Sequence, residues 1–153
     1  MSRKNEFVLE KLEKLDEIIN AFLDLKDSVY EKTIFDGNYL TTYVEKIHKY
    51  GNTFVIKRDT KIIGLVAFYA NDLVKKYAFI TMIVIRKDWQ KHGFGKKLIE
   101  LAKKESISAG MTTLGLWVHK ENLNARGFYK KIGFIETGKT NKKQNFAIID
   151  LLE

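Results

Sequence analysis

Cysteine is absent from the 153-residue chain, and histidine occurs only three times. Without cysteine there is no disulfide framework, no thiolate zinc site and no thiol that could carry an acyl group. The three histidines are far apart in the sequence, so their spacing predicts no metal site. No apolar run approaches the roughly 18 residues of a membrane span, and residues 1–17 are too charged for a secretory signal. We therefore expect a cytoplasmic protein with no metal and no membrane partner.

Charge of one sign predominates, with 27 lysines and arginines against 19 aspartates and glutamates and a net charge of +8. The lysines are scattered rather than gathered into a block, so we expect no nucleic-acid partner. A polyanionic small ligand and simple solubility are both compatible with the excess. With 45% hydrophobic residues, the chain is expected to fold as one domain over residues 1–153.

Apolar residues recur at intervals of three and four in four stretches, as in helices that bury one face. The predicted helices span residues 7–25, about 40–47, 95–108 and 122–131. Runs rich in β-branched and aromatic residues predict strands at 53–57, 62–70, 77–85, 113–118, 134–137 and 146–152.

The lengths of the connections predict how these strands pair. The first three strands are joined by short loops, which favours an antiparallel meander. The helix at 95–108 lies between the strands at 77–85 and 113–118, so this βαβ unit should make them parallel neighbours. We expect an α/β (α+β) fold with a mixed, mostly antiparallel central sheet and helices on both faces.

The turn between the strand at 77–85 and the next helix is the first candidate site. It reads Gln90-Lys91-His92-Gly93-Phe94-Gly95, followed by Lys96. Glycines at such a turn permit close approach of a ligand, and the N–H groups of a helix N-terminus attract phosphate. A tight turn that needs two glycines is the alternative. Leu98 stands where a third glycine would complete a dinucleotide fingerprint, and the spacing of a Walker A loop is absent.

A second candidate begins at Asn122, just past the strand at 113–118, and ends at Phe134. Tyr129 follows Asn122 by two helical turns, so both side chains can face the same side of the helix. The alternative is structural: Asn122 would cap the helix, while Phe128 and Tyr129 would be core aromatics.

Together these motifs resemble the GNAT superfamily of acyl-CoA-dependent N-acetyltransferases. The resemblance covers about residues 53–151. It lies in the order of the motifs: a hydrophobic strand, Q-x-x-G-x-G, a second strand, and N-x-x-A-x-x-F-Y-x-x-x-G-F. It implies a GNAT-like fold whose parallel strand pair splays apart, acetyl-CoA as cosubstrate, and a monomer or homodimer.

The resemblance also implies a role for each motif. Tyr129 would protonate the leaving thiolate, and Asn122 would bind the pantetheine or the adenine-nucleotide side. Backbone at Ile83, Val84 and Ile85 would pair with pantetheine, and an N–H near Ile83 would stabilise the acyl oxygen. The pyrophosphate would bind at Gln90, Lys91, His92, Gly93, Phe94, Gly95 and Lys96.

One feature common in the superfamily is missing. Many members carry a glutamate on the strand before the phosphate turn, but residues 77–85 contain no acid. His119 is a candidate base, because histidine exchanges protons near neutral pH. A solvated loop histidine is the alternative. Asp72 and Glu121 are further candidates that would equally suit a turn or a helix cap.

The expected reaction is direct acetyl transfer to the primary amine of a small molecule, such as an amino sugar or an amino acid, in a ternary complex. The resemblance implies an acceptor pocket built from about residues 29–43, 68–72 and 137–146, which include several aromatic residues. Protein N-terminal or lysine acetylation is one alternative, and a catalytically silent acyl-CoA-binding module is another.

Overall fold

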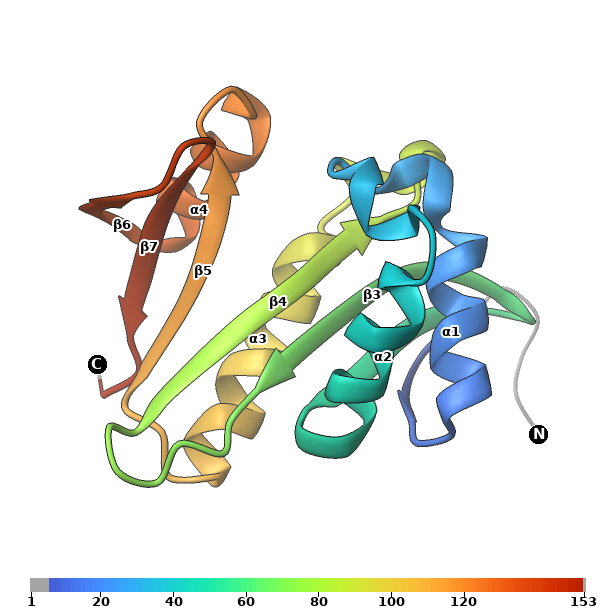
Figure 1. The fold of residues 1–153 in the computed structure, drawn as a ribbon, viewed down its shortest axis with the longest axis horizontal. Helices are drawn as coiled ribbons and strands as arrows, with labels where there is room; N and C mark the ends of the chain where they lie inside the picture. The colour runs from blue at the N-terminus through green and yellow to red at the C-terminus, as the bar shows by residue number, and fades with distance from the viewer. Residues whose placement is uncertain (1–5, 153) are drawn as a thin grey trace.

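The computed structural model describes residues 6–152, which form a seven-stranded sheet flanked by helices (Figure 1). The strands are β1 (Phe7–Leu12), β2 (Asn52–Arg58), β3 (Lys61–Tyr69), β4 (Tyr77–Ile85), β5 (Thr113–His119), β6 (Ile135–Thr140) and β7 (Gln144–Asp150). The α-helices are α1 (Leu15–Asp24), α2 (Tyr39–Tyr50), α3 (Phe94–Ser108) and α4 (Leu123–Ile132). Short 3₁₀ helices are η1 (Lys26–Ser28), η2 (Lys32–Phe35) and η3 (Lys87–Trp89).

The start of the predicted first helix is wrong. Residues 7–12 form the edge strand β1, which pairs antiparallel with β2 from Phe7↔Arg58 to Leu12↔Thr53. Leu9 and Leu12 fit a helical period, but local periodicity carries no information about a free strand edge far along the chain. Pairing with that edge overrides the local preference, and the helix begins only at Leu15.

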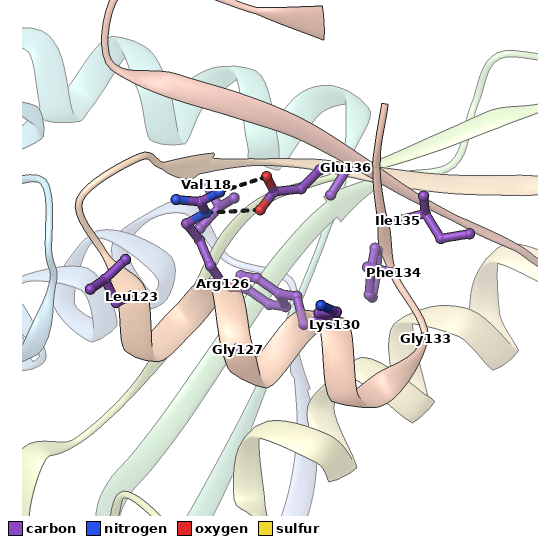
Figure 2. Close-up of a pocket in the computed structure, with 11 residues that line it drawn as sticks. Val118, Leu123, Arg126, Gly127, Lys130, Gly133, Phe134, Ile135 and Glu136 are labelled. Atoms are coloured by element: carbon purple, nitrogen blue, oxygen red, sulfur yellow. Dashed lines mark hydrogen bonds and ion pairs between the residues drawn. The ribbon is translucent and has the colours of Figure 1, made fainter. Parts of the chain in front are cut away.

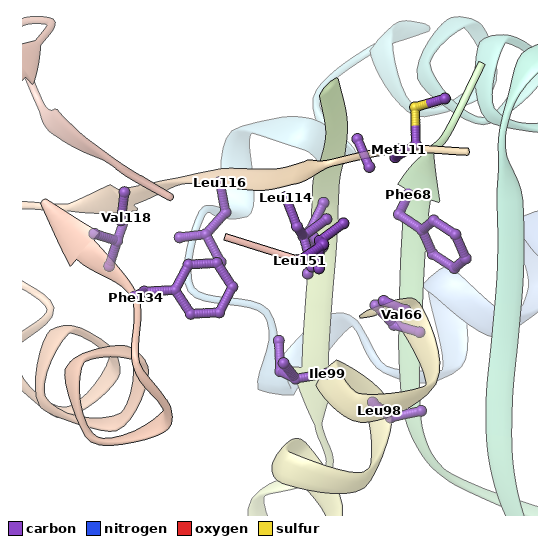
Figure 3. Close-up of a cluster of buried hydrophobic side chains, with 14 of the residues drawn as sticks. Val66, Phe68, Leu98, Ile99, Met111, Leu114, Leu116, Val118, Phe134 and Leu151 are labelled. Carbon is purple, nitrogen blue, oxygen red and sulfur yellow. The ribbon is translucent and has the colours of Figure 1, made fainter. Parts of the chain in front are cut away.

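The two faces of the sheet bury separate hydrophobic cores. Helices α1 and α2 cover one core, in which Phe22, Val44 and Leu65 are fully or almost fully buried. Helix α3 covers the other core, where Leu98 and Ile99 meet side chains of the central strands (Figure 3). The prediction of helices on both faces is confirmed.

Strand β4 contains a β-bulge at its middle, and the bulge changes which core its side chains enter. Ala67 of β3 pairs with Met82, whereas the next residue pairs with Ile80, so Thr81 is the extra residue. Ala78 and Ile80 lie in the α3 core, but Met82 and Val84 pack in the α1–α2 core. A bulge bends a strand and re-aims its side chains, which is the effect seen here.

Beyond the bulge, β4 and β5 separate. Their parallel pairing runs only from Tyr77↔Thr113 to Ile80↔Leu116. Figure 1 shows the two strands diverging toward their C-terminal ends. Strand β5 keeps its other neighbour, β7, along its whole length. The predicted splayed parallel pair is therefore confirmed, and residues 81–85 of β4 have no strand partner on the side of β5, a break in the sheet that we call the gap.

Candidate active site

The edge of β4 directs backbone groups into the gap. Arg86 N–H donates to Ile63 O at 2.8 Å, and hydrogen-bonded pairs alternate along an antiparallel ladder. Val84 therefore directs its N–H and C=O toward β3, while Ile83 and Ile85 direct theirs into the gap. The Ile85 carbonyl accepts from Gln90 Nε2 at 3.0 Å. The N–H and C=O of Ile83 are thus directed toward a ligand that would bind in the gap. Val84 directs its backbone groups to β3 and contributes only its side chain, which packs in the core.

The turn after β4 has the geometry of an anion site. Lys91 and Gly93 both adopt positive φ, at 66° and 85°, and Gly93 is the N-cap of α3. The helical hydrogen bonds of α3 begin with Lys97 N–H to Gly93 O, so the N–H groups of the first turn before Lys97 find no acceptor within the helix. A Cβ built on Gly93 would meet no atom within 4 Å, so space for a ligand lies beside it.

The side chains of this turn divide into two groups. Phe94 is buried and packs its ring against Trp89 and Phe7, with centroid distances of 6.0 and 4.8 Å. It therefore anchors the turn and offers a ligand only its backbone. The exposed side chains are Gln90, Lys91, His92 and Lys96. A Cβ on Gly95 would lie 2.9 Å from the Phe128 ring, so this glycine permits close packing of α3 against α4.

Asn122 caps α4, as its structural interpretation predicted. Its Oδ1 accepts from Ala125 N–H at 3.2 Å. The Nδ2 of its amide has no hydrogen bond to another residue in the described part of the chain, so the ligand role proposed for Asn122 rests on that nitrogen. Capping and ligand binding use different atoms of the same amide and are compatible.

Tyr129 lies on the inner side of α4, with its ring 5.7 Å from that of Phe134. Burial raises the pKa of Tyr129 well above the usual range, so its hydroxyl is protonated at neutral pH. It lines a cavity of about 530 Å³ between α4 and the strands β5, β6 and β7, which we call the α4 cavity (Figure 2). Arg126 and Glu136 form a bidentate ion pair in its wall, with both N–O distances 2.9 Å. None of the other predicted site residues lines this cavity.

His119 is not a solvated loop histidine. Its side chain is 17% exposed, its Nε2 lies 3.3 Å from Glu31 Oε2, and its ring centroid is 4.9 Å from that of Tyr30. His119 Nε2 and the Glu31 carboxylate are close enough to form an ion pair, but their geometry is not that of a hydrogen bond. Nothing local in the sequence marks Glu31, because the connection between α1 and α2 reaches β5 only in the fold.

A second cavity, of about 350 Å³, surrounds this pair, and we call it the hairpin cavity. It is lined by Tyr30 and Glu31 from the α1–α2 connection, by the end of β5, and by the turn between β6 and β7. The pKa of Glu31 is lowered mainly by the hydrogen bond that the Thr33 hydroxyl donates to it. This carboxylate is therefore ionised at neutral pH. The full lining is Tyr30, Glu31, His119, Lys120, Glu121, Lys142 and Lys143.

A tyrosine from α2 fastens the bulge of β4. The Tyr43 hydroxyl donates to Thr81 O at 2.8 Å and lies 2.7 Å from Thr81 Oγ1. Burial raises the pKa of Tyr43 well above the usual range. Tyr43 belongs to the aromatic residues of the expected acceptor region, and the structure makes it a support of the point where β4 leaves β5. The sequence pattern contains no sign of this contact, because the bulge itself has none.

Asp72 Oδ1 accepts from the N–H groups of Val74 and Lys75, at 3.2 and 2.9 Å, so it acts as a turn residue. Across residues 6–152 there is no group of three histidine, aspartate or glutamate side chains with the geometry to hold a metal ion. Over the same residues, no helix has the length and apolar character needed to span a bilayer.

Comparison with known proteins places this geometry in a family. The model of the acetyltransferase (GNAT) family matches residues 15–134. An L-ornithine N5-acetyltransferase of Arabidopsis thaliana is 31% identical over 78 residues, which cover 49% of this chain. The chain spans only about a third, 34%, of the length of that curated relative.

Solved structures agree in fold. A Pyrococcus horikoshii OT3 protein, PH1933, superposes with a TM-score of 0.78 at 28% identity, covering 95% of this chain and 98% of the other. The PaiA N-acetyltransferase of Thermoplasma acidophilum, solved in complex with coenzyme A, gives 0.74 at 15% identity, with 94% and 99% covered. Because the family model spans most of the chain and includes both site motifs, the protein belongs to the GNAT family of acetyltransferases.

Proposed function

We propose that the protein transfers an acetyl group from acetyl-CoA to the primary amine of a small molecule. The observation that carries the proposal is the splayed edge of β4. Ile83 directs its N–H and C=O into the gap, and the uncapped N–H groups of α3 lie at its end. The family uses acetyl-CoA, a neighbour of the same fold is solved with coenzyme A, and a relative acetylates ornithine.

On the donor side, the residues present fit a long ligand that has amides and a pyrophosphate. Acetyl-CoA would supply an activated acetyl group, which this chain has no cysteine to carry. Gln90 to Lys96 would hold the pyrophosphate through the N–H groups of the α3 N-terminus. The open space at Gly93 admits the phosphates, and Ile83 would pair with an amide of the pantetheine arm.

At the reacting centre, two groups of the chain would act during direct attack by the amine. The Ile83 N–H would stabilise the negative charge that develops on the acyl oxygen, as in an oxyanion hole. The Tyr129 hydroxyl would donate its proton to the leaving thiolate. Burial raises the pKa of Tyr129, so the hydroxyl carries its proton at neutral pH.

The proton of the amine requires an acceptor, and we propose His119. The Glu31 carboxylate faces one ring nitrogen and would stabilise the imidazolium that forms, which leaves the other nitrogen for the amine. Replacing His119 by Gln should lower turnover near pH 7 by about 10²-fold or more. The lost activity should return as the pH approaches deprotonation of the amine itself. A uniform loss at all pH values would contradict this role.

The size of the hairpin cavity suits a small acceptor, and a contact between two chain segments restricts access to a protein substrate although the cavity is partly open to solvent. The ring contact between Tyr30 and His119 joins the α1–α2 connection to β5 across the mouth of the gap. A volume of about 350 Å³ lies in the range of small-molecule pockets. An extended peptide would need this contact to open.

The decisive experiment is thiol release from acetyl-CoA with a panel of small amines, with an N-terminal peptide as comparison. We expect turnover with small amines and little with the peptide. Acetyl-CoA alone should raise the melting temperature, because a ligand that binds only the native state stabilises it. No shift at millimolar acetyl-CoA would remove the cofactor assignment, and binding without any turnover would favour a silent acyl-CoA-binding module.

A further inference from the structure

The hairpin cavity has an unbalanced set of charges. Three lysines, Lys120, Lys142 and Lys143, line it together with two glutamates, Glu31 and Glu121. Within the described residues, none of the three lysines has a carboxylate within 4 Å. Glu31 already faces His119, so the lysines are cations without a fixed partner on the wall of a small cavity.

The turn between β6 and β7 presents two of these lysines in a defined position. Asn141 Oδ1 accepts from Lys143 N–H and Gln144 N–H, at 3.0 and 2.8 Å. Lys120 N–H donates to Lys143 O at 2.9 Å, which ties the turn to the end of β5. The backbone that carries Lys142 and Lys143 is therefore fixed beside His119, and the two lysines lie on the wall that includes the proposed base.

Opposite charges thus share one cavity. Lys143 is close enough to Glu31 to be among the charges that lower the pKa of that carboxylate, after the larger effect of the Thr33 hydroxyl. A ligand with an amine at one end and an anion at the other complements this arrangement. A diamine would place its second ammonium among lysines, which costs free energy through repulsion between like charges.

We propose that the acceptor is an amine that also carries a carboxylate or phosphate group, with Lys142 and Lys143 binding the anion while Glu31 and His119 face the amine. This rests on the proposed function, since it names the substrate class of the same site. The lysine side chains are largely solvated, so each anion contact is a modest charge-assisted interaction. We expect a preference of about tenfold from the two together.

Matched pairs of amines isolate the anion. L-Ornithine and putrescine differ by one carboxylate, and glucosamine 6-phosphate and glucosamine differ by one phosphate. The kcat/KM should be about tenfold higher for the anionic member of at least one pair, and the pair that responds distinguishes a carboxylate from a phosphate. The double variant Lys142→Gln, Lys143→Gln should bring that ratio close to one. Lys104→Gln, which removes an exposed charge from α3, is the control for net charge and should leave the ratio unchanged.

Calorimetric titration of the same pairs in the presence of coenzyme A separates this proposal from the proposed function. Tighter binding of an anionic member, lost in the double variant, supports it even if no amine is turned over, in which case only the enzymatic assignment fails. Equal or weaker binding of both anionic members overturns it, and so does a binding ratio that the double variant leaves unchanged. Turnover of putrescine in preference to ornithine, with no preference for glucosamine 6-phosphate, also overturns it.

Discussion

The sheet has two unequal parts that meet at the splay of β4 and β5. Strands β1 to β4 with helices α1 to α3 contain most of the fully buried side chains, and α3 alone buries Phe94, Leu98, Ile99, Ala102 and Ser106. In the other part, α4 buries no residue fully, and all six residues of β6 are exposed. Helix α3 therefore buries more side chains than α4, and the proposed site takes its phosphate turn from the first part and Tyr129, His119 and the lysine-bearing turn from the second.

The two parts share the α3 core, in which Ile99 of α3 lies with Leu116 of β5 and with Phe134, but their strands pair over a short stretch. Strands β4 and β5 pair over only four residues. Gly95 packs against Phe128, and Tyr30 against His119. We call this boundary the seam, and the residues of the proposed site lie on both sides of it. Substitutions on the buried face of α3 should thus lower stability, while those at the less buried residues of α4 should alter chemistry at nearly constant stability.

The largest effect is expected from removing the Tyr129 hydroxyl. Tyr129→Phe should lower turnover by about 10²- to 10⁴-fold, because a positioned general acid contributes that much. The melting temperature and the affinity for acetyl-CoA should change little, since the ring still packs against Phe134. Steady-state kinetics and calorimetric titration measure both. Unchanged turnover would remove Tyr129 as the acid, and a large loss of stability would contradict the contrast between the two parts.

A core truncation tests the first part. Leu98 is fully buried on the inner face of α3, so Leu98→Ala should lower the free energy of unfolding by about 2–5 kcal/mol. Leu123 of α4 is 71% exposed, and Leu123→Ala is the matched control, with an expected change within about 0.5 kcal/mol. Denaturant unfolding gives both values. Similar losses for the two variants would show that the parts do not differ in the way described.

The seam itself is tested at Tyr43. Removing its hydroxyl leaves the part-buried Thr81 carbonyl without this donor, so Tyr43→Phe should cost about 1–3 kcal/mol in unfolding free energy. Turnover should fall as well, because the bulge that separates β4 from β5 loses its support. Tyr39→Phe removes a hydroxyl from an exposed neighbour, at 57% exposure, and serves as the control. Loss of stability with full turnover would mean that the bulge is held by other contacts.

The same contrast explains what could be predicted from the sequence. The βαβ unit, the glycine-bearing turn at residues 90–95 and the cap of α4 depend on residues close in the chain, and their spacing revealed them, while phosphate binding at that turn stays a prediction. Strand β1, the contact between Glu31 and His119, and the Tyr43–Thr81 bond depend on partners far along the chain. The spacing of apolar residues within a short stretch of sequence contains no information about partners far along the chain. A β-bulge likewise produces no recognisable pattern of residues. The proposed acceptor side, which includes Glu31, His119 and Tyr43, was therefore the least predictable.

The smallest effect distinguishes the two roles of Asn122. Asn122→Ala removes the acceptor for Ala125 N–H and should lower the unfolding free energy by about 1 kcal/mol. Asn122→Asp keeps a capping oxygen, and its negative charge is favourable at a helix N-terminus, but it lacks the Nδ2 donor. If the amide nitrogen binds acetyl-CoA, the Asp variant should keep its stability and lose about 3- to 10-fold in affinity, the equivalent of one hydrogen bond. Affinity equal to that of the unmodified protein would leave Asn122 with the capping role alone. The second part of the sheet would then contribute the proposed proton donor, base and lysines, but no contact to the cofactor at this position.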